Sequence, residues 1–129
     1  MTADTSILIV DDYPTMVRIM RKLLKQIGYE NVDEAGSGAE ALGKIDQKKY
    51  QLIISDWNME PMTGLALLKS VRGNPDLSKT PFILVTAESK ADNIVAAREA
   101  NVNGYLIKPF SAVALKERID SALSGAVMA

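Results

Sequence analysis

Five short apolar runs, separated by stretches with helical periodicity, constrain the fold of this sequence more than any other feature. The runs lie at residues 7–10, 32–35, 52–55, 82–85 and 105–107. Three of them, "ILIV", "LIIS" and "FILV", are apolar or small throughout, whereas a strand with one face in water would alternate. Helices are therefore expected on both faces of the sheet, which is typical of parallel strands in alternating β/α order. We predict the α/β class, with a doubly wound (βα)5 fold and a parallel five-stranded sheet.

The intervals between the runs predict five helices. In the first, an apolar stripe extends from Met16 to Ile27 at helical spacing. Pro14 suits the first turn, where no backbone donor is lost, and Gly28 suits the end of the helix. The first helix is thus expected directly after the strand at residues 7–10.

The other helices are predicted from cap residues and apolar spacing. Ser37, Thr63 and Ser111 are the expected N-caps, with Glu40 at capping-box spacing from Ser37. The third helix is expected to stop before Gly73, and the fourth to start at the "SKAD" segment. The side chains expected to face inward are Leu65, Leu68 and Val71 in the third helix, Ile94 and Val95 in the fourth, and Leu115, Ile119 and Leu123 in the fifth.

The composition limits the chemistry that the chain can perform. Its 129 residues suit one domain that buries a core without disulfides. A net charge of −1, with acids and bases interspersed, offers no field for nucleic acid or anionic lipid. Because cysteine and histidine are both missing from the sequence, oxygen ligands suited to Mg²⁺ or Ca²⁺ remain. No signal peptide or membrane span is recognisable, which predicts a cytoplasmic protein without membrane contact.

Polar residues gather where the predicted strands end. Asp11 and Asp12 follow the first strand, Asp56 the third, Thr86 the fourth and Lys108 the fifth. Sites in open parallel sheets form at the carboxyl ends of the strands, so these groups are expected to converge. Taken singly, Asp12 is also a suitable helix N-cap, Thr86 an ordinary strand-end residue and Lys108 a solvated loop charge. Together they are hard to assign to chance.

The chemistry of this set favours a phosphoryl site. Three close carboxylates repel one another unless a cation sits among them, and without histidine or cysteine an oxygen-binding ion such as Mg²⁺ is favoured. Lys108 and Thr86 offer a point charge and a hydroxyl donor for phosphoryl oxygens. An aspartate can itself be the nucleophile and form an acyl phosphate.

The segments "LIVDDYPTMVRIMRKLL", "ISDWNMEPMTGLALLK", "VTAE" and "GYLIKPF" resemble the receiver domains of two-component response regulators. The likeness to stand-alone chemotaxis regulators of the CheY type is especially close, and it covers about residues 6–123. It implies a flavodoxin-like, CheY-like strand order of 2-1-3-4-5. It also implies a single receiver domain over residues 1–129 without an effector domain, and a phosphoacceptor switch rather than an enzyme.

The resemblance implies a role for each acidic residue. Asp56 would be the phosphorylated aspartate. Asp12 and Asp56 would bind Mg²⁺ together with the backbone carbonyl of Asn58, and Asp11 would act mostly through water. Asn58 and Glu88 match the pair that tunes hydrolysis of the acyl phosphate, and we expect a short-lived phosphoryl group.

The resemblance also implies a switch. Lys108 would hold one phosphoryl oxygen, Thr86 would move to hydrogen-bond another, and Ala87 would leave room for the group. Tyr105 resembles the aromatic residue that turns inward when the threonine moves. The bond between Lys108 and Pro109 matches the family's cis peptide.

Two departures from the family pattern lie near the predicted nucleophile. Glu60 stands where the family usually has proline, with Pro61 following it, and Thr63 occupies a position that is often aspartate. Glu60 is either an exposed loop residue or an additional charge that changes metal affinity. Trp57, the only tryptophan, matches the family beside the nucleophile.

The implied partners are a sensor histidine kinase as phosphodonor, a phosphatase, and a downstream protein such as the flagellar motor switch. The downstream protein would bind a face formed by the fourth helix, the last strand and the fifth helix of a monomeric chain. That face is expected to include Tyr105, Ile94, Val95, Arg98, Val113 and Lys116. The alternative is a phosphate sink or a regulator of a kinase pathway that makes no motor contact.

Other classes of protein fit the sequence less well. A flavodoxin needs a hydroxyl- and glycine-rich loop after the first strand, where Asp11 and Asp12 would repel the flavin phosphate. A haloacid-dehalogenase-type phosphatase needs two aspartates spaced by one residue there, whereas these two are adjacent. No nucleotide P-loop pattern occurs. An interaction module that has lost phosphorylation would not need so complete a site.

Overall fold

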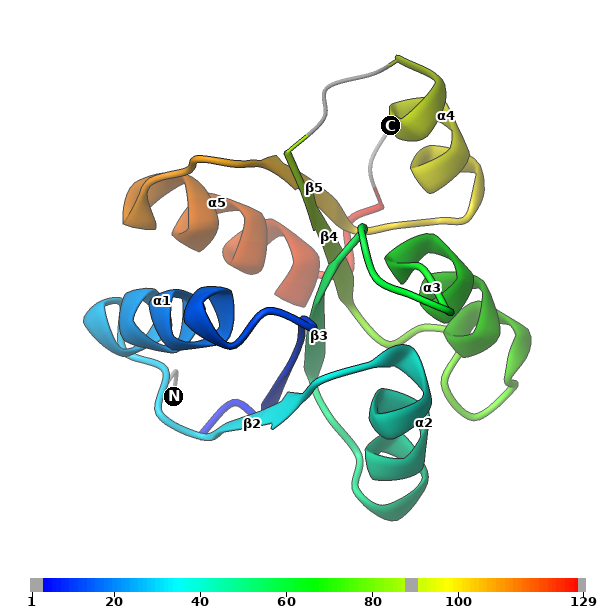
Figure 1. Cartoon of the computed structure of the whole chain (residues 1–129), viewed down its shortest axis with the longest axis horizontal. Coiled ribbons are helices and arrows are strands. Elements are labelled where there is room, and N and C mark those ends of the chain that lie inside the picture. The colour runs from blue at the N-terminus through cyan, green and yellow to red at the C-terminus, as the bar shows by residue number, and fades with distance from the viewer. Residues whose placement is uncertain (1–3, 88–90, 128–129) are drawn as a thin grey trace.

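The computed structural model describes residues 4–87 and 91–127 and contains a parallel β-sheet between two layers of helices (Figure 1). The strands lie in the order β2-β1-β3-β4-β5, as the resemblance implied. Helices α1 and α5 cover one face, and α2, α3 and α4 cover the other. The elements in chain order are β1 (Ile7–Val10), α1 (Pro14–Gln26), β2 (Val32–Ala35), α2 (Gly38–Gln47), β3 (Leu52–Asp56), α3 (Gly64–Gly73), β4 (Phe82–Thr86), α4 (Ala91–Glu99), β5 (Gly104–Ile107) and α5 (Ala112–Leu123).

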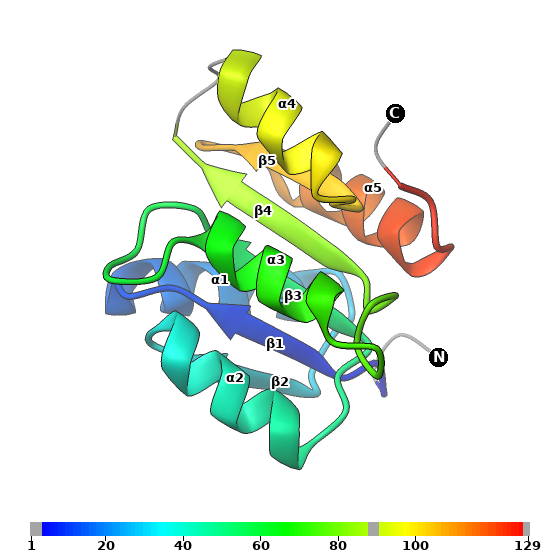
Figure 2. The same cartoon turned by 90° about the vertical axis from the view of Figure 1, so that its right-hand side faces the viewer.

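The sheet is buried on both sides, which explains the uninterrupted apolar runs. Leu8 and Ile53 belong to the core beneath α2 and α3, while Ile9 and Ile54 belong to the core beneath α1 and α5. Successive strand side chains point to opposite faces, so each run supplies both cores. All strands run in the same direction, and their carboxyl ends meet at one edge of the molecule (Figure 2).

The predicted helix caps are confirmed. The hydroxyl oxygens of Ser37, Thr63 and Ser111 each accept a hydrogen bond from the backbone N–H three residues later. The Glu40 carboxylate also contributes to the cap of α2. It accepts a hydrogen bond from the N–H of Gly36, at 3.0 Å, rather than from the N–H of the N-cap residue, Ser37. Capping satisfies donors that the first turn of a helix leaves without partners.

At the end of α1, Gly28 has a positive φ of 101°, a conformation in which a side chain would be strained. This supports its predicted place at the end of that helix.

Three predictions about the helices were wrong. Val95 is 45% exposed, because it lies two residues, about 200° of helical turn, from the buried Ala97. Leu123 is 36% exposed, because Ala122 takes the last inward position of α5. Gly73 lies inside α3 rather than after it. Ser89 and Lys90, at the predicted start of the fourth helix, lie outside the described residues. Among the helices that are described, none is long and apolar enough to span a membrane.

Candidate functional site

The three aspartates predicted at strand ends lie together at the carboxyl edge of the sheet. Val10 is the partner of Ser55 in the β1–β3 register, so the next residues, Asp11 and Asp56, stand side by side. Both are buried, at 7% and 6% exposure, while Asp12 is exposed. One carboxylate oxygen from each of the three residues lies within 4.8 Å of the others. The strand order thus brings together acids that are 45 positions apart in the chain.

The buried position of Asp11 changes its protonation. Burial is the main reason that the pKa of the Asp11 carboxyl rises from 3.8 to about 6. The hydrogen bond from the N–H of Tyr13 to Asp11 Oδ1, at 3.0 Å, opposes this rise, and the charge of Asp56 adds to it. A cation close to this carboxyl would oppose the rise, because an opposite charge favours the ionised form.

Lys108 supplies one positive charge to the cluster. Its Nζ donates a hydrogen bond to Asp56 Oδ1 at 2.9 Å, and its backbone N–H donates to the carbonyl of Thr86 at 2.7 Å. The backbone bond fixes the start of the β5–α5 connection against the end of β4. The peptide between Lys108 and Pro109 is cis, as the resemblance implied. Lys108 therefore belongs to the site, and the alternative of a solvated loop charge is not observed.

The loop after Asp56 is fixed by backbone contacts. Trp57 donates its N–H to the carbonyl of Val85 at 2.8 Å and accepts from the N–H of Gly64 at 3.0 Å. A Cβ at Gly64 would lie 2.2 Å from the backbone oxygen of Asp56, so only glycine allows α3 to begin this close to the backbone of Asp56. Glu60 is exposed, and the Glu60–Pro61 peptide is also cis, which the sequence analysis did not predict.

The two predicted switch residues are both buried. Thr86 is fully buried at the end of β4, and Tyr105 on β5 is 7% exposed. The Tyr105 ring makes an edge-to-face contact with Trp57, with ring centroids 6.2 Å apart and planes at 82°. Edge-to-face pairs are a favourable aromatic arrangement. This contact joins the residue beside Asp56 to the strand farthest from the acids.

Other predicted residues lie at the rim of the site. Asn58 and Ala87 are exposed beside the ends of β3 and β4, and Glu88 lies outside the described residues. The alternative that Asp12 serves as a helix cap is not observed. The N-cap of α1 is Tyr13, and no side chain caps that helix end.

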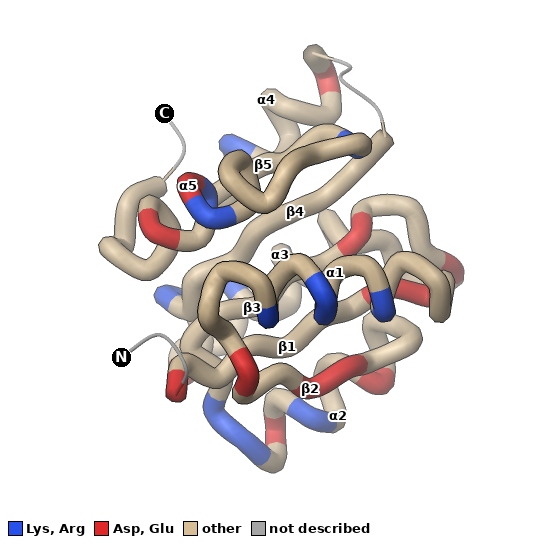
Figure 3. Tube along the Cα trace, turned by 90° about the vertical axis from the view of Figure 1, so that its left-hand side faces the viewer, with Lys and Arg blue, Asp and Glu red and all other residues tan. Residues whose placement is uncertain are grey.

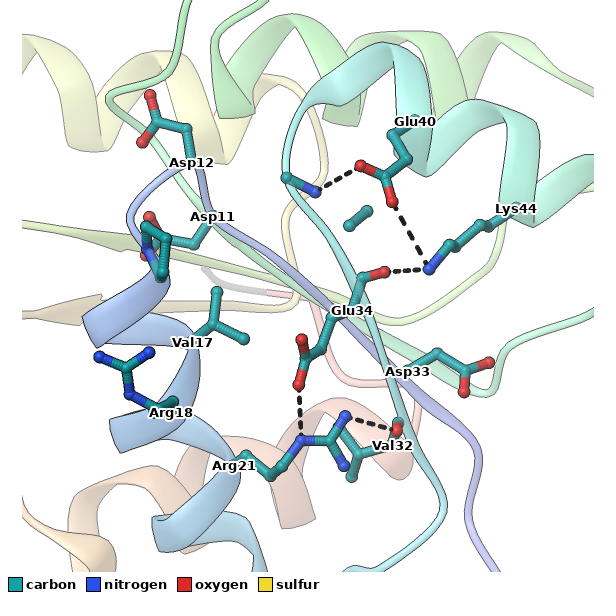
Figure 4. Close-up of a pocket in the computed structure, with 13 residues that line it drawn as sticks. Asp11, Asp12, Val17, Arg18, Arg21, Val32, Asp33, Glu34, Glu40 and Lys44 are labelled. Carbon is teal, nitrogen blue, oxygen red and sulfur yellow. Dashed lines mark hydrogen bonds and ion pairs between the residues drawn. The ribbon is translucent and has the colours of Figure 1, made fainter.

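The sequence analysis missed a polar cleft beside the acids. This cleft, of about 560 Å³, lies between α1, β2 and α2 (Figure 4), and Asp11 and Asp12 form one end of it. Arg21, Glu34 and Lys44 line the rest and are linked by hydrogen bonds and ion pairs. Two consecutive acids inside the strand "VDEA" were the available signal, because acids are uncommon in strands.

The donor set at the site fits a hard divalent cation. It includes three carboxylates, two of them on buried residues, and the buried Asp11 carboxyl has a raised pKa that a cation would lower. The charges in this part of the chain are separated, since Asp11 and Asp12 precede α1, whereas the body of that helix carries only basic charges (Figure 3).

A parallel sheet with strand order 2-1-3-4-5, with an acidic cluster and a lysine at the carboxyl ends of its strands, is typical of proteins that accept a phosphoryl group. The chain belongs to the response regulator receiver domain family, whose model matches residues 7–120. Members of this family are typically phosphorylated by histidine kinases and typically bind Mg²⁺ in an acidic pocket.

Within this family, the chain is similar to chemotaxis proteins of the CheY type. The chain is 46% identical over 114 residues to the chemotaxis protein CheY of Pseudomonas aeruginosa, covering 88% of this chain and 92% of that protein. It is 44% identical over 114 residues to CheY-3 of Vibrio cholerae, covering 88% of each. The structure of Vibrio cholerae CheY4 superposes with a TM-score of 0.84 at 31% identity, covering 92% of this chain and 98% of that one. The chain is thus a receiver domain of the CheY type.

Proposed function

We propose that this chain is a single-domain response regulator that accepts a phosphoryl group on Asp56 from a sensor histidine kinase. The observation that carries the proposal is the Lys108–Asp56 contact of 2.9 Å inside a cluster of three carboxylates. A carboxylate Oδ of Asp56 would attack phosphorus in line, forming an acyl phosphate while the bond from phosphorus to the donor's imidazole nitrogen breaks. Lys108 would move its hydrogen bond from the carboxylate to a phosphoryl oxygen.

The acidic cluster supports Mg²⁺ as the cofactor of this transfer. Asp12, Asp56 and the backbone carbonyl of Asn58 would hold the ion, with Asp11 acting through water. When bound, the ion would supply positive charge that offsets repulsion between the carboxylates and the phosphoryl oxygens. The surrounding residues of the chain would orient the Asp56 carboxylate and limit the access of water to it.

The output would be a change on the face formed by α4, β5 and α5. Thr86 and Tyr105, both buried, would respond to the new charge on Asp56 and so transmit the change to this face. Ala87 would leave room for the phosphoryl group. Three large apolar side chains are exposed there, Val95 at 45%, Ile107 at 39% and Val113 at 67%. Exposed apolar side chains on these three elements would suit a protein partner. Ile94, Arg98 and Lys116 complete the proposed face.

The partner we propose is a flagellar motor-switch protein, and the setting is chemotaxis in the cytoplasm. The support is the identity of 44–46% with relatives that are named chemotaxis proteins. We infer a monomer whose acyl phosphate is short-lived, with Asn58 and Glu88 tuning its hydrolysis and a phosphatase assisting.

The first experiment follows Trp57 fluorescence during addition of Mg²⁺ and then of beryllofluoride or acetyl phosphate. We expect a response to Mg²⁺ and a further response to the phosphoryl compound, with one phosphoryl group added in the intact mass after acetyl phosphate treatment. Asp56→Asn should abolish the phosphoryl-type response and the mass change. The matched control, Asp46→Asn, removes an exposed acid on α2 and should behave as the unmodified protein. If the intact mass never changes, phosphorylation of Asp56 is wrong.

A second experiment separates motor control from a phosphate sink. Binding of a motor-switch peptide is measured by calorimetry with and without beryllofluoride. The proposal expects tighter binding in the activated form and loss of the gain in Val113→Asp. Equal and weak binding in both forms would contradict motor control and favour the phosphate sink.

A further inference from the structure

The free edge of β2 is closed by side chains from the two helices beside it. β2 is the outermost strand of the sheet. The carbonyls of Asn31 and Ala35 accept hydrogen bonds from the N–H groups of Ile7 and Asp11, so they point toward β1. Backbone groups alternate in direction along a strand. The carbonyls of Val32 and Glu34 therefore point outward, away from the sheet.

Both outward carbonyls accept a hydrogen bond from a basic side chain (Figure 4). Arg21 on α1 donates from Nη2 to the carbonyl of Val32 at 3.0 Å, and Lys44 on α2 donates from Nζ to the carbonyl of Glu34. The outward N–H of Gly36, the next residue in this direction, donates to Glu40 Oε1 at 3.0 Å. Two outward positions of β2 and the residue that follows the strand are thus engaged by three side chains.

Ion pairs hold these side chains in place. Arg21 Nε is 2.7 Å from Glu34 Oε2, and Lys44 Nζ is 3.6 Å from Glu40 Oε2. All four side chains are between 39% and 51% exposed. Exposed pairs of this kind contribute little to the free energy of folding. Stability alone therefore does not explain so complete a set of contacts on one strand edge.

The opposite edge of the sheet shows the same arrangement. Lys108 N–H points toward β4, so the carbonyl of Tyr105, an odd number of residues away, points outward from β5. Arg118 on α5 donates from Nε to this carbonyl at 3.3 Å. A long basic side chain from a neighbouring helix covers an outward carbonyl on each free edge.

We propose that Arg21 and Lys44 guard the β2 edge against strand addition by a second copy of this chain. An unguarded edge offers a row of carbonyl and N–H groups to any extended segment, and the edge of another sheet is the most available one. With the guard in place, an incoming strand must first displace two hydrogen-bonded cations and separate two ion pairs. The guard keeps the receiver sheet at five strands and leaves other surfaces to its partners.

The test replaces both guards by an apolar side chain of similar length, in Arg21→Met combined with Lys44→Met. The matched control is Lys22→Met combined with Lys25→Met, which makes the same charge change and adds the same apolar surface at exposed positions of α1. Self-association of each is measured by sedimentation. Because two carbonyls become available, we expect the guard variant to associate roughly tenfold more tightly than the control, or tighter still.

Hydrogen exchange then shows whether the association uses the β2 edge. The N–H of Glu34 points outward in the monomer, so it should become protected as the concentration of the guard variant rises. Equal association of the two variants, or association without protection of Glu34, would overturn the proposal. If the double variant does not fold, Arg21→Met and Lys44→Met are measured singly, because each uncovers one carbonyl. The unphosphorylated chain serves throughout, because pairing along the edge of β2 needs no phosphoryl group.

Discussion

Helices α1 and α4 both follow strands that end at the site, but they are attached to the sheet very differently. α1 buries Val17, Met20 and Leu24, and α4 buries only Ala97 among its residues. Burying a large apolar side chain contributes about 2 kcal/mol, whereas an alanine contributes far less. α1 is therefore firmly anchored beside the acids, and α4 is lightly held beside Thr86.

This difference in packing divides the site into a fixed half beside α1 and a lightly held half beside α4. The acids that would receive the cation and the phosphoryl group follow β1 and β3, close to the anchored helix. Thr86 and Tyr105 belong to β4 and β5, next to the helix with the smallest buried contact. Elements that move in switching come from the weakly packed part of a fold. The packing thus favours α4, rather than α1, as the part that responds to a charge at Asp56.

The largest predicted effect tests the anchoring of α1. Leu24→Ala should lower the free energy of unfolding by about 3 kcal/mol, because it removes a fully buried side chain and leaves a cavity. Ile94→Ala, on the inner side of α4 but only partly buried, should cost about 1 kcal/mol. Urea denaturation measures both. If the two costs were equal, the contrast between the helices would be lost.

The next effect concerns the acids in the fixed half. Because the pKa of Asp11 is raised from 3.8 to about 6, the folded chain binds this proton more tightly than the unfolded chain. Its contribution to stability is complete below pH 3.8 and is lost as the pH rises through 6. With a chelator present, the unfolding free energy should lose about 3 kcal/mol from this group across that window.

Asp11→Asn removes this titration, and the pH dependence of unfolding should flatten between pH 4 and 6 relative to the unmodified protein. Asp46→Asn, at an exposed position, should leave the slope unchanged. Saturating Mg²⁺ should also reduce the slope, because a bound cation favours the charged carboxylates. An identical slope for Asp11→Asn and the unmodified protein would contradict the assignment.

A smaller effect tests how lightly α4 is held. Ala97→Val adds two methyl groups at a fully buried position, where overpacking in a rigid core costs about 1–3 kcal/mol. Because α4 has only Ala97 buried, we expect the lower end of this range, with a change in the Trp57 fluorescence response to beryllofluoride. Ala122→Val on α5 is the matched change beneath an anchored helix and should cost more.

The smallest effect is expected at the surface of α4. Val95→Ala should change the unfolding free energy by less than about 0.5 kcal/mol, because the side chain is largely in water. The same change should weaken binding of a motor-switch peptide to the activated form, as measured by calorimetry. A large loss of stability would mean that Val95 packs against the rest of the chain.

Much of the fold could be predicted from local pattern. The strand at residues 7–10 and the caps Ser37, Thr63 and Ser111 agree with the sequence analysis, because apolar runs and cap hydroxyls act within a few residues of themselves. Val95 and Leu123 were wrong, because a weakly amphipathic helix and a helix end do not show which face meets the sheet. The strand order was implied by the resemblance and not by periodicity.

The sequence by itself determined which groups this protein brings to its site: aspartates, a threonine and a lysine directly after strands, in a chain without histidine or cysteine. A strand end is a local property, and so is the identity of the residue that follows it. Only the tertiary structure decided the distances, such as 2.9 Å from Lys108 to Asp56, across 52 positions of sequence. It also decided that Arg21 and Lys44 meet the edge of β2, since contacts between elements depend on packing that no single segment contains.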